Sequence, residues 1–380
     1  MNLELTEDQQ TLSETIGRLL KDRYDHSTRL ELLRSELGWS KDMWKRYADL
    51  GLLGLPFDEE YGGAGMGFAE VAVVLEEFGK ALVLEPYIAT VVLAGGLVAA
   101  AGTDEQKKSI LSAISAGESI MAFAASEPGA RWSLTDVSTK AEKSGDGWTI
   151  SGEKSGVLAG DSADQFVVSA TTADGVVGLF LVDGKADGVR RDSYTQQDGL
   201  RAANVLFDGA AAQALGDPAN AAAAMKSVID EATAGLCAEA VGAMGQMLSI
   251  TSEYLKTRVQ FGTAIGTFQV LQHRSADMYV SLEQARSMAV TSRLAITDGD
   301  EGLERDQTLR AAKVQIDTSA RHIGQESIQM HGGIGVTMEY PIGHYTKRLT
   351  VIARTFGDTD SHLQAFAKAG GLLVASDTVA

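Results

Sequence analysis

The sequence has little of what marks disulfide-stabilised, membrane-spanning or largely disordered proteins. Its 380 residues include a single cysteine, Cys237, so no disulfide can form within the chain. A reducing compartment, the cytoplasm, is therefore expected. The 5 prolines argue against long disordered linkers. The longest apolar run, residues 91–101, is shorter than the roughly 20 residues that a membrane span requires, and the acidic, polar start of the chain lacks the pattern of a signal peptide.

Positive charge is scarce as well. Lysine and arginine number 33 against 51 aspartate and glutamate residues, which gives a net charge of −18. This balance disfavours nucleic acids and anionic membranes as partners. A negatively charged ligand would need basic residues gathered at one place, so individual arginines and lysines become informative. No histidine, cysteine or aspartate cluster has the spacing of metal ligands, and no metal site is predicted.

The first region of the chain, residues 1–120, has the hydrophobic spacing of helices. Thr6 with Gln9, and Thr103 with Gln106, have the spacing of capping boxes, in which each side chain bonds the other residue's backbone N–H at a helix start. Between them, the segment GFAEVAVVLEEFGKAL has apolar residues three and four apart. We expect an N-terminal helical domain.

The second region, residues 121–215, has the shorter period of β-strands. Apolar residues are concentrated in the segments QFVVSAT, VVGLFLV and AANVLFD, which follow one another at short intervals. Gly145-Asp146-Gly147 lies between two further strand-like segments and predicts a hairpin. We expect a small, mostly antiparallel and barrel-like β domain.

The third region, residues 216–380, is again helical. Long apolar-faced segments with short connections predict an antiparallel four-helix bundle. The segments are 221–260, 267–297, 305–330 and a last helix from Thr359, with glycines and Pro341 breaking the pattern at 332–343. The predicted fold class is therefore mostly α with a middle β domain.

Two motifs in the third region carry the most specific signal. They are Arg258-Val-Gln-Phe261-Gly262, followed by Phe268-Gln269, and Gln329-Met-His-Gly332-Gly333-Ile-Gly335. Together with Ser126-Glu127-Pro128-Gly129 upstream, and in this order, they resemble the acyl-CoA dehydrogenase family over nearly the whole chain. The family's fold agrees with the three regions described above.

The resemblance implies an FAD-dependent enzyme that dehydrogenates an acyl-CoA thioester between its α and β carbons. In this family a carboxylate removes the α-proton while the β-hydrogen leaves as hydride to the flavin. The resemblance also implies an oligomer in which a neighbouring subunit completes each FAD site, and an electron-transferring flavoprotein as electron acceptor. The residues it places on the ADP side of FAD are Arg258, Gln260, Phe261, Gln269, Gln329, Gly332 and Gly333.

Each of these residues also has an ordinary structural interpretation. The planar guanidinium of Arg258 suits a pyrophosphate, and the alternative is a surface arginine paired with Glu253 or another carboxylate. Gly332 and Gly333 let a backbone approach a ligand closely, but a glycine here could also cap a helix end. Phe261 could be a core residue, and Gln269 could lie on the polar face of a helix. Cys237 is interpreted as a small buried hydrophobic residue rather than a nucleophile.

The chain departs from the family where the catalytic base is expected. The family's glutamate commonly lies just before Gly-Thr, and the matching segment here is Phe356-Gly357-Asp358-Thr359. Gly357 has no side chain to act as a base. Asp358 carries a carboxylate one position later and one methylene shorter, and base geometry is demanding. In some relatives the base lies on the first long bundle helix, where this chain has Ala232 beside Glu231. Asp358 and Glu231 are the candidate bases.

A second departure concerns the segments that hold the flavin ring in this family. Where the family has a Thr-Glu-Pro-Gly-Ala-Gly-Ser-Asp segment, this chain has bulky residues at Arg131 and Trp132. Where the family has a Trp-Ile-Thr or Trp-Ile-Ser segment, this chain has Lys154-Ser155-Gly156-Val157-Leu158. The ADP-side half of an FAD site is therefore intact in the sequence, whereas the half that positions the flavin ring and the base is degraded.

Three hypotheses follow. In the first, the chain is the non-base subunit of a heteromeric acyl-CoA dehydrogenase, an α2β2 tetramer whose second, related subunit carries the base. Such enzymes resemble those of bacterial steroid side-chain or dicarboxylate degradation. The second is a homomeric dehydrogenase that uses Asp358 or Glu231. The third is a non-catalytic scaffold without flavin.

Overall fold

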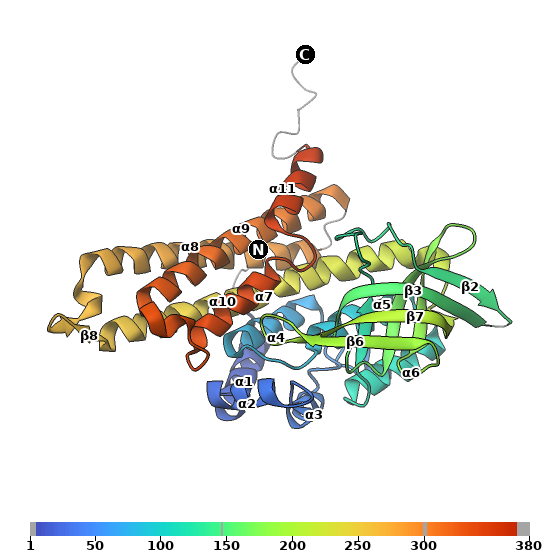
Figure 1. The fold of residues 1–380 in the computed structure, drawn as a ribbon, viewed down its shortest axis with the longest axis horizontal. Coiled ribbons are helices and arrows are strands. Elements are labelled where there is room, and N and C mark those ends of the chain that lie inside the picture. Colours follow the sequence, from blue (N-terminus) through green and yellow to red (C-terminus); the bar gives the residue numbers. More distant parts are fainter. Residues whose placement is uncertain (1–4, 146, 299–301, 371–380) are drawn as a thin grey trace, which may run out of the picture. The chain divides into compact units, whose positions relative to one another are not determined.

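The structure, a computed structural model, describes residues 5–145, 147–298 and 302–370. These residues form two compact units, each built from separate stretches of the chain. In their described parts, the first unit comprises Met1–Thr28, Phe68–Val83 and Thr233–Ala380, and the second comprises Arg29–Gly67 and Leu84–Ala232. Figure 1 shows the elements of both units, coloured along the sequence.

The first unit is almost entirely helical (Figure 1). Helix α2 (His26–Arg34) runs from this unit into the second, and α7 (Ala221–Thr257) runs from the second into this one. The remaining elements are α1 (Glu7–Arg23), α4 (Phe68–Ala81), β8 (Val259–Gln260), β9 (Thr263–Ala264), η4 (Ile265–Thr267), α8 (Gln269–Thr297), α9 (Gly302–His331), η5 (Gly332–Val336), α10 (Pro341–Ile352) and α11 (Thr359–Lys368).

Helices α4 and α7 cross at glycines with their backbones in contact. A Cβ atom on Gly79 of α4 would lie 2.0 Å from the carbonyl oxygen of Glu239. A Cβ atom on Gly242 of α7 would lie 1.9 Å from the carbonyl oxygen of Glu76. Neither position has room for any side chain, because real Cβ contacts are never this short. The crossing therefore fixes the spacing of α4 and α7.

A buried ion pair lies beside this crossing. The guanidinium of Arg348 on α10 donates two hydrogen bonds to Glu239 on α7, from Nε at 2.5 Å and from a terminal nitrogen at 2.7 Å. The hydroxyl of Tyr345, also on α10, donates to the carbonyl oxygen of Lys80 at the end of α4. Helix α10 is therefore held to both members of the crossing by directional polar contacts.

The second unit contains a β-sheet and short helices. Its helical elements are α3 (Lys41–Asp49), η1 (Glu59–Tyr61), η2 (Ile88–Gly95), α5 (Gly96–Ala101), α6 (Asp104–Ser115) and η3 (Pro218–Asn220). Its strands are β1 (Met121–Ala124), β2 (Lys140–Ser144), β3 (Gly147–Leu158), β4 (Gln165–Thr171), β5 (Val177–Asp183), β6 (Val189–Thr195) and β7 (Arg201–Ala214).

The strand pairings close into a barrel. Strand β4 pairs with β5, β5 with β7, β7 with β3, β3 with β2, and β2 returns to β4 through the single pair Lys140–Thr171. Strand β1 adds in parallel to β4, and β6 adds antiparallel to β7. Alternate residues of each strand face inward and form one apolar core, which includes Ile150, Phe166, Val168, Phe180, Val182, Val205 and Phe207.

The fold class predicted from the sequence is confirmed, with local corrections. Both capping boxes are present, at Thr6–Gln9 and at Thr103–Gln106. The expected hairpin is the antiparallel β2–β3 pair, although Asp146 itself lies outside the described residues.

The break expected over residues 332–343 is wrong in part, because α10 begins at Pro341. Proline has no backbone N–H to lose at the first helical position, so it starts this helix rather than ending one. Strands β1 and β6 were not foreseen. The boundaries 1–120, 121–215 and 216–380 remain predictions. Among the described residues, no helix combines the length and hydropathy needed to cross a membrane.

Candidate functional site

One end of the helical unit gathers the two motifs. The hydroxyl of Thr251 near the end of α7 lies 3.2 Å from that of Ser327 near the end of α9. One turn further along each helix, the rings of Tyr254 and His331 stack with centroids 4.3 Å apart. Helix α8 begins beside the same end of α9, where Arg274 forms an ion pair with Glu326 at 2.5 Å. The segments after α7, before α8 and after α9 therefore lie at one end of this unit (Figure 1).

A tight hairpin presents Phe261 to solvent. Strands β8 and β9 pair through Gln260 and Thr263, so Phe261 and Gly262 form the two-residue turn. Both have positive φ, 54° and 82°, as a type I′ turn requires. The Phe261 side chain is 94% exposed, so it is not a core residue. A bulky residue held at positive φ with its ring in solvent is typical of a position that contacts another molecule.

Arg258 has a fixed backbone and a side chain that forms no ion pair with the residues that the structure describes. Its backbone N–H donates to the carbonyl of Tyr254, and its carbonyl accepts from Ile265, both at 2.8 Å. The alternative partner, Glu253, instead pairs with Lys256 at 2.6 Å. Within the described part of the chain, no carboxylate lies within ion-pair distance of the Arg258 guanidinium. The guanidinium is exposed and able to receive an anion.

Gln329, Gly332 and Gly333 form an open surface where α9 ends. Gln329 is exposed on the last turn of the helix, and Gly332 has a φ of 62°. This is the helix-ending glycine considered as the structural alternative. A Cβ atom on either glycine would meet no atom of residues 5–145, 147–298 or 302–370 within 4 Å. Gly332 therefore ends helix α9, and the backbone at Gly332 and Gly333 is also accessible to a ligand.

The two remaining glutamines lie at the same end. Gln269 is the first residue of α8 and is exposed. Gln260 is exposed too, but its side-chain amide donates to the neighbouring carbonyl of Val259 at 2.7 Å. All seven residues predicted for the ADP side of FAD are thus exposed at one end of one unit.

The structure places the two candidate bases differently. Asp358 caps α11, where its carboxylate accepts from the backbone N–H of Ser361 at 2.8 Å. This hydrogen bond lowers the pKa of Asp358, with burial opposing it, and a lower pKa makes the carboxylate a weaker base. Glu231 is half-buried on α7, next to the fully buried Ala232. Asp358 also lines a cavity of about 410 Å³ between α9, α10 and α11, with Asp317, Arg321, Gln325, Thr346, Thr350 and Arg354 among the other lining residues.

Buried polar side chains lie in the core beside α11. On α9, the ammonium of Lys313 donates hydrogen bonds to both carboxylate oxygens of Asp317, at 2.8 and 2.7 Å. Burial raises the pKa of Asp317 to about 6, although Lys313 opposes this. Burial also raises the pKa of Cys237 to about 12, so its thiol stays protonated and is no nucleophile. His362 of α11 is buried as well, with 7% of its surface exposed.

The burial of His362 predicts a loss of stability in acid. Burial, and then the positive charges of Lys313 and Arg310, lower the pKa of His362 to about 4, with Asp358 opposing. Its ordinary pKa is 6.5, so the unfolded chain binds the proton more readily and stability falls as the pH drops from about 6.5 towards 4. We expect His362 to account for about 2 kcal/mol of destabilisation between about pH 7 and pH 5.

Urea unfolding of the wild type and of His362→Gln at both pH values measures this contribution. The raised pKa of Asp317 makes this group stabilise the folded protein at low pH, opposite to His362. Because both proteins contain Asp317, its contribution cancels when their free energies of unfolding are subtracted. Equal pH dependence in both proteins would show that His362 is not a buried neutral group.

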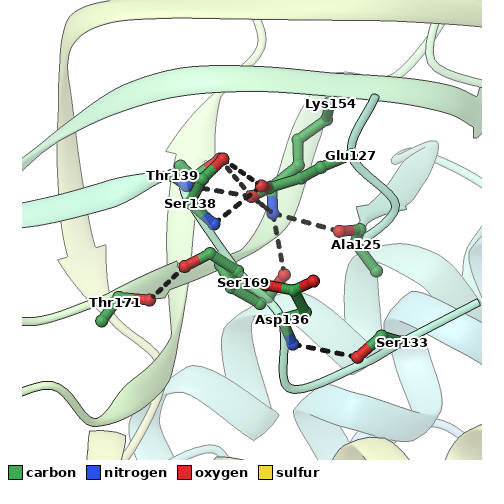
Figure 2. A network of polar contacts seen from close by, with 10 residues as sticks. Ala125, Glu127, Ser133, Asp136, Ser138, Thr139, Lys154, Ser169 and Thr171 are labelled. Carbon is green, nitrogen blue, oxygen red and sulfur yellow. Dashed lines mark hydrogen bonds and ion pairs between the residues drawn. The ribbon is translucent and has the colours of Figure 1, made fainter. Parts of the chain in front are cut away.

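The second unit contains a buried network that the sequence did not reveal (Figure 2). The ammonium of Lys154 on β3 donates to Glu127 at 2.8 Å, to the carbonyl of Ala125 at 3.1 Å and to the hydroxyl of Ser169 at 3.0 Å. Glu127 also accepts the backbone N–H and hydroxyl of both Ser138 and Thr139. The side chains of Lys154 and Glu127 are 0% and 3% exposed.

Both partners of this pair are charged at neutral pH. Burial opposes ionisation of Glu127, but the hydrogen bonds from Lys154, Ser138 and Thr139 outweigh it and lower its pKa to about 2. Burial lowers the pKa of Lys154 to about 8, with Glu127 opposing. The pair is therefore ionised and saturated with hydrogen bonds, the condition under which a buried pair is stable.

The network ties together the two ends of the loop 128–137. Glu127 precedes this loop, and Ser138 and Thr139 follow it, so one carboxylate closes the loop at its base. The loop carries the exposed side chains of Arg131 and Trp132, and Arg131 has a φ of 52°. The sequence did contain a signal. Lys154 lies four residues after Ile150 in the same strand, so both side chains point to the same, buried face. A lysine that faces a core needs a carboxylate as partner.

Comparison with known proteins assigns the family. Three family models match the chain in order: Acyl-CoA dehydrogenase, N-terminal domain, at residues 6–118; middle domain at 122–209; and C-terminal domain at 221–371. A probable acyl-CoA dehydrogenase, YngJ of Bacillus subtilis, is 30% identical over 355 residues, which cover 90% of this chain and 92% of that protein. The chain belongs to the acyl-CoA dehydrogenase family.

Two further comparisons extend this assignment. The mitochondrial isovaleryl-CoA dehydrogenase of Pongo abelii is 29% identical over 358 residues, which cover 90% of this chain and 84% of that protein. A solved structure of a variant of the Tcur3481-Tcur3483 steroid ACAD superposes with a TM-score of 0.86 at 32% identity, covering 96% of this chain and 97% of that one. Family members are oxidoreductases, and FAD is the cofactor.

The residues present fit the ADP side of FAD. The unpaired Arg258 guanidinium suits a pyrophosphate, and the open backbone at Gly332 and Gly333 allows close approach of a ligand. Exposed Phe261 offers an apolar contact. For the flavin ring, loop 128–137 offers the bulky Arg131 and Trp132. The fit therefore covers one half of the cofactor.

Proposed function

We propose that the chain is the non-base subunit of a heteromeric acyl-CoA dehydrogenase. It would supply the ADP-side half of an FAD site, from Arg258 to Gly333, to a partner subunit that binds the flavin ring and carries the base. The observation that carries the proposal is an asymmetry. The ADP-side residues are all exposed and open, whereas position 357 has no side chain and Asp358 is engaged as a helix cap.

Exposed apolar residues support a partner at this end of the unit. Soluble proteins rarely leave large apolar side chains clustered in solvent without a function for them. Exposed apolar residues in or beside the two motifs, in addition to Phe261, are Val270, Ile334, Val336 and Met338, which are 64, 43, 67 and 51% exposed. A second subunit that completes an FAD site here would bury them.

Similarity to the Tcur3481-Tcur3483 structure supports the two-subunit arrangement and a bulky, steroid-like acyl group. That protein is described by two subunit names and as a steroid ACAD, and it shares 32% identity with this chain. The proposed reaction is α,β-dehydrogenation of an acyl-CoA, in which bound FAD accepts a hydride. An α2β2 assembly, an electron-transferring flavoprotein as acceptor and a cytoplasmic location complete the proposal.

Two alternatives make different predictions. A homomeric enzyme using Asp358 or Glu231 would hold one FAD per chain and be reduced by acyl-CoA alone. A scaffold without flavin would bind no FAD under any condition, but the unpaired Arg258 then has no explanation. We therefore favour the heteromer.

The test compares the chain alone with the chain co-expressed with a second acyl-CoA dehydrogenase-like subunit. Native mass and FAD absorbance are measured on both samples. We expect little flavin on the chain alone and about one FAD per pair in the complex, because each site needs both halves. One FAD per chain in the protein purified alone would instead establish the homomer.

A further inference from the structure

Gly357 and His362 are in direct contact inside the first unit. A Cβ atom built on Gly357 would lie 2.5 Å from Nε2 of His362, 2.9 Å from Cε1 and 3.1 Å from Cδ2. The direction in which a side chain would leave residue 357 therefore leads straight into the imidazole. Both residues are buried, so the ring cannot move into solvent without opening the core.

The imidazole is enclosed by the core of the first unit. His362 is 7% exposed and lies in the first turns of α11, whose start is fixed by the Asp358–Ser361 capping box. The buried ring fills the space that a side chain at residue 357 would need. Its neutral form also avoids a third buried charge beside Lys313 and Asp317.

We propose that His362 closes the position from which a family member's catalytic base would extend, so that this chain cannot regain a base by a single substitution at Gly357. His362 is not a catalytic residue in this role, because it touches the backbone of residue 357 and no reacting group. This inference deepens the proposed function and rests on it, since it explains why the base must come from a partner.

Two obstacles to a side chain at position 357 can be separated by experiment. Gly357 has a φ of 118°, which strains any other residue whatever the space around it. The contact with His362 is a second, steric cost. A double-mutant cycle between Gly357→Ala and His362→Ala measures only the steric cost, because the φ strain is the same in both backgrounds and cancels.

The experiment follows the thermal unfolding of the full-length chain by circular dichroism. We expect Gly357→Ala to lower Tm at least roughly twice as much in the wild type as in the His362→Ala background. Gly129→Ala is the matched control, since Gly129 has a φ of 85° and open space around it. It should lower Tm equally in both backgrounds.

Equal losses for Gly357→Ala in the two backgrounds would overturn the proposal. As a second variant, Gly357→Glu should unfold the wild-type chain but give a folded protein in the His362→Ala background. Failure of Gly357→Glu in both backgrounds, with no coupling in the alanine cycle, would also count against it. Neither measurement uses flavin or a partner, so its outcome is independent of the FAD stoichiometry that tests the proposed function.

Discussion

Replacing Lys154 by methionine is expected to destabilise the protein by about 3–5 kcal/mol. Methionine matches the length of the lysine stem but removes the charge, so Glu127 would be left as a buried carboxylate without its cation. Breaking one side of a buried pair costs far more than the pair contributes, because the remaining charge stays desolvated. The loss should appear in urea unfolding of the full-length chain followed by circular dichroism.

Two further variants make this prediction specific. Lys185→Met removes an exposed lysine of the same unit and should change stability by less than about 0.5 kcal/mol. Glu127→Gln combined with Lys154→Met removes both charges and should recover part of the loss, because no uncompensated ion remains. If Lys154→Met proved as mild as Lys185→Met, the pair would not be buried as described.

Replacing Arg258 by alanine is expected to strip FAD from the heteromeric complex. A bidentate, charge-assisted contact with phosphate contributes about 1.5–3 kcal/mol, so FAD should bind roughly 10- to 100-fold more weakly. Folding should be unaffected, because the side chain is exposed and makes no ion pair among the described residues. The FAD dissociation constant and the flavin retained after gel filtration report the effect.

Charge alone should not restore the contact. Arg258→Lys keeps the positive charge but loses the planar fork, and it should bind FAD with intermediate affinity. Arg18→Ala, an exposed arginine on α1 of the same unit, should leave FAD binding unchanged. Full flavin occupancy in Arg258→Ala would remove the main support for the proposed shared site.

The elements that the sequence predicted well depend on local information. Capping boxes at Thr6 and Thr103 involve residues three apart, and the long helices have regular apolar spacing. The two FAD motifs were recognised as linear patterns, and α7 and α9 then bring them to the same end of the unit. Pro341 was misjudged because proline has opposite meanings at the start and in the middle of a helix.

The features that the sequence did not reveal depend on contacts between distant residues. Glu127 and Lys154 were each noted within a motif, but their pairing arises only when β3 passes the loop that follows β1. The sequence indicated that Gly357 cannot be a base. That the ring of His362 occupies the adjoining space depends on how α11 packs, which no linear pattern encodes. That Glu253 pairs with Lys256 and, among the described residues, leaves Arg258 without an ion pair likewise required the three-dimensional structure.

The glycine crossing of α4 and α7 has a consequence at the level of the gene. Every glycine codon becomes an alanine codon by one base change, so alanine is among the variants that mutation supplies most often at Gly79 and Gly242. Alanine is also the better helix former, by about 1 kcal/mol, and at an exposed helical site it would stabilise the protein. At these two sites its methyl group would meet a carbonyl oxygen of the other helix at about 2 Å. If a library of single-codon variants is selected for folded protein, alanine variants at Gly79 and Gly242 should therefore be depleted, while alanine variants at exposed helical positions should be retained.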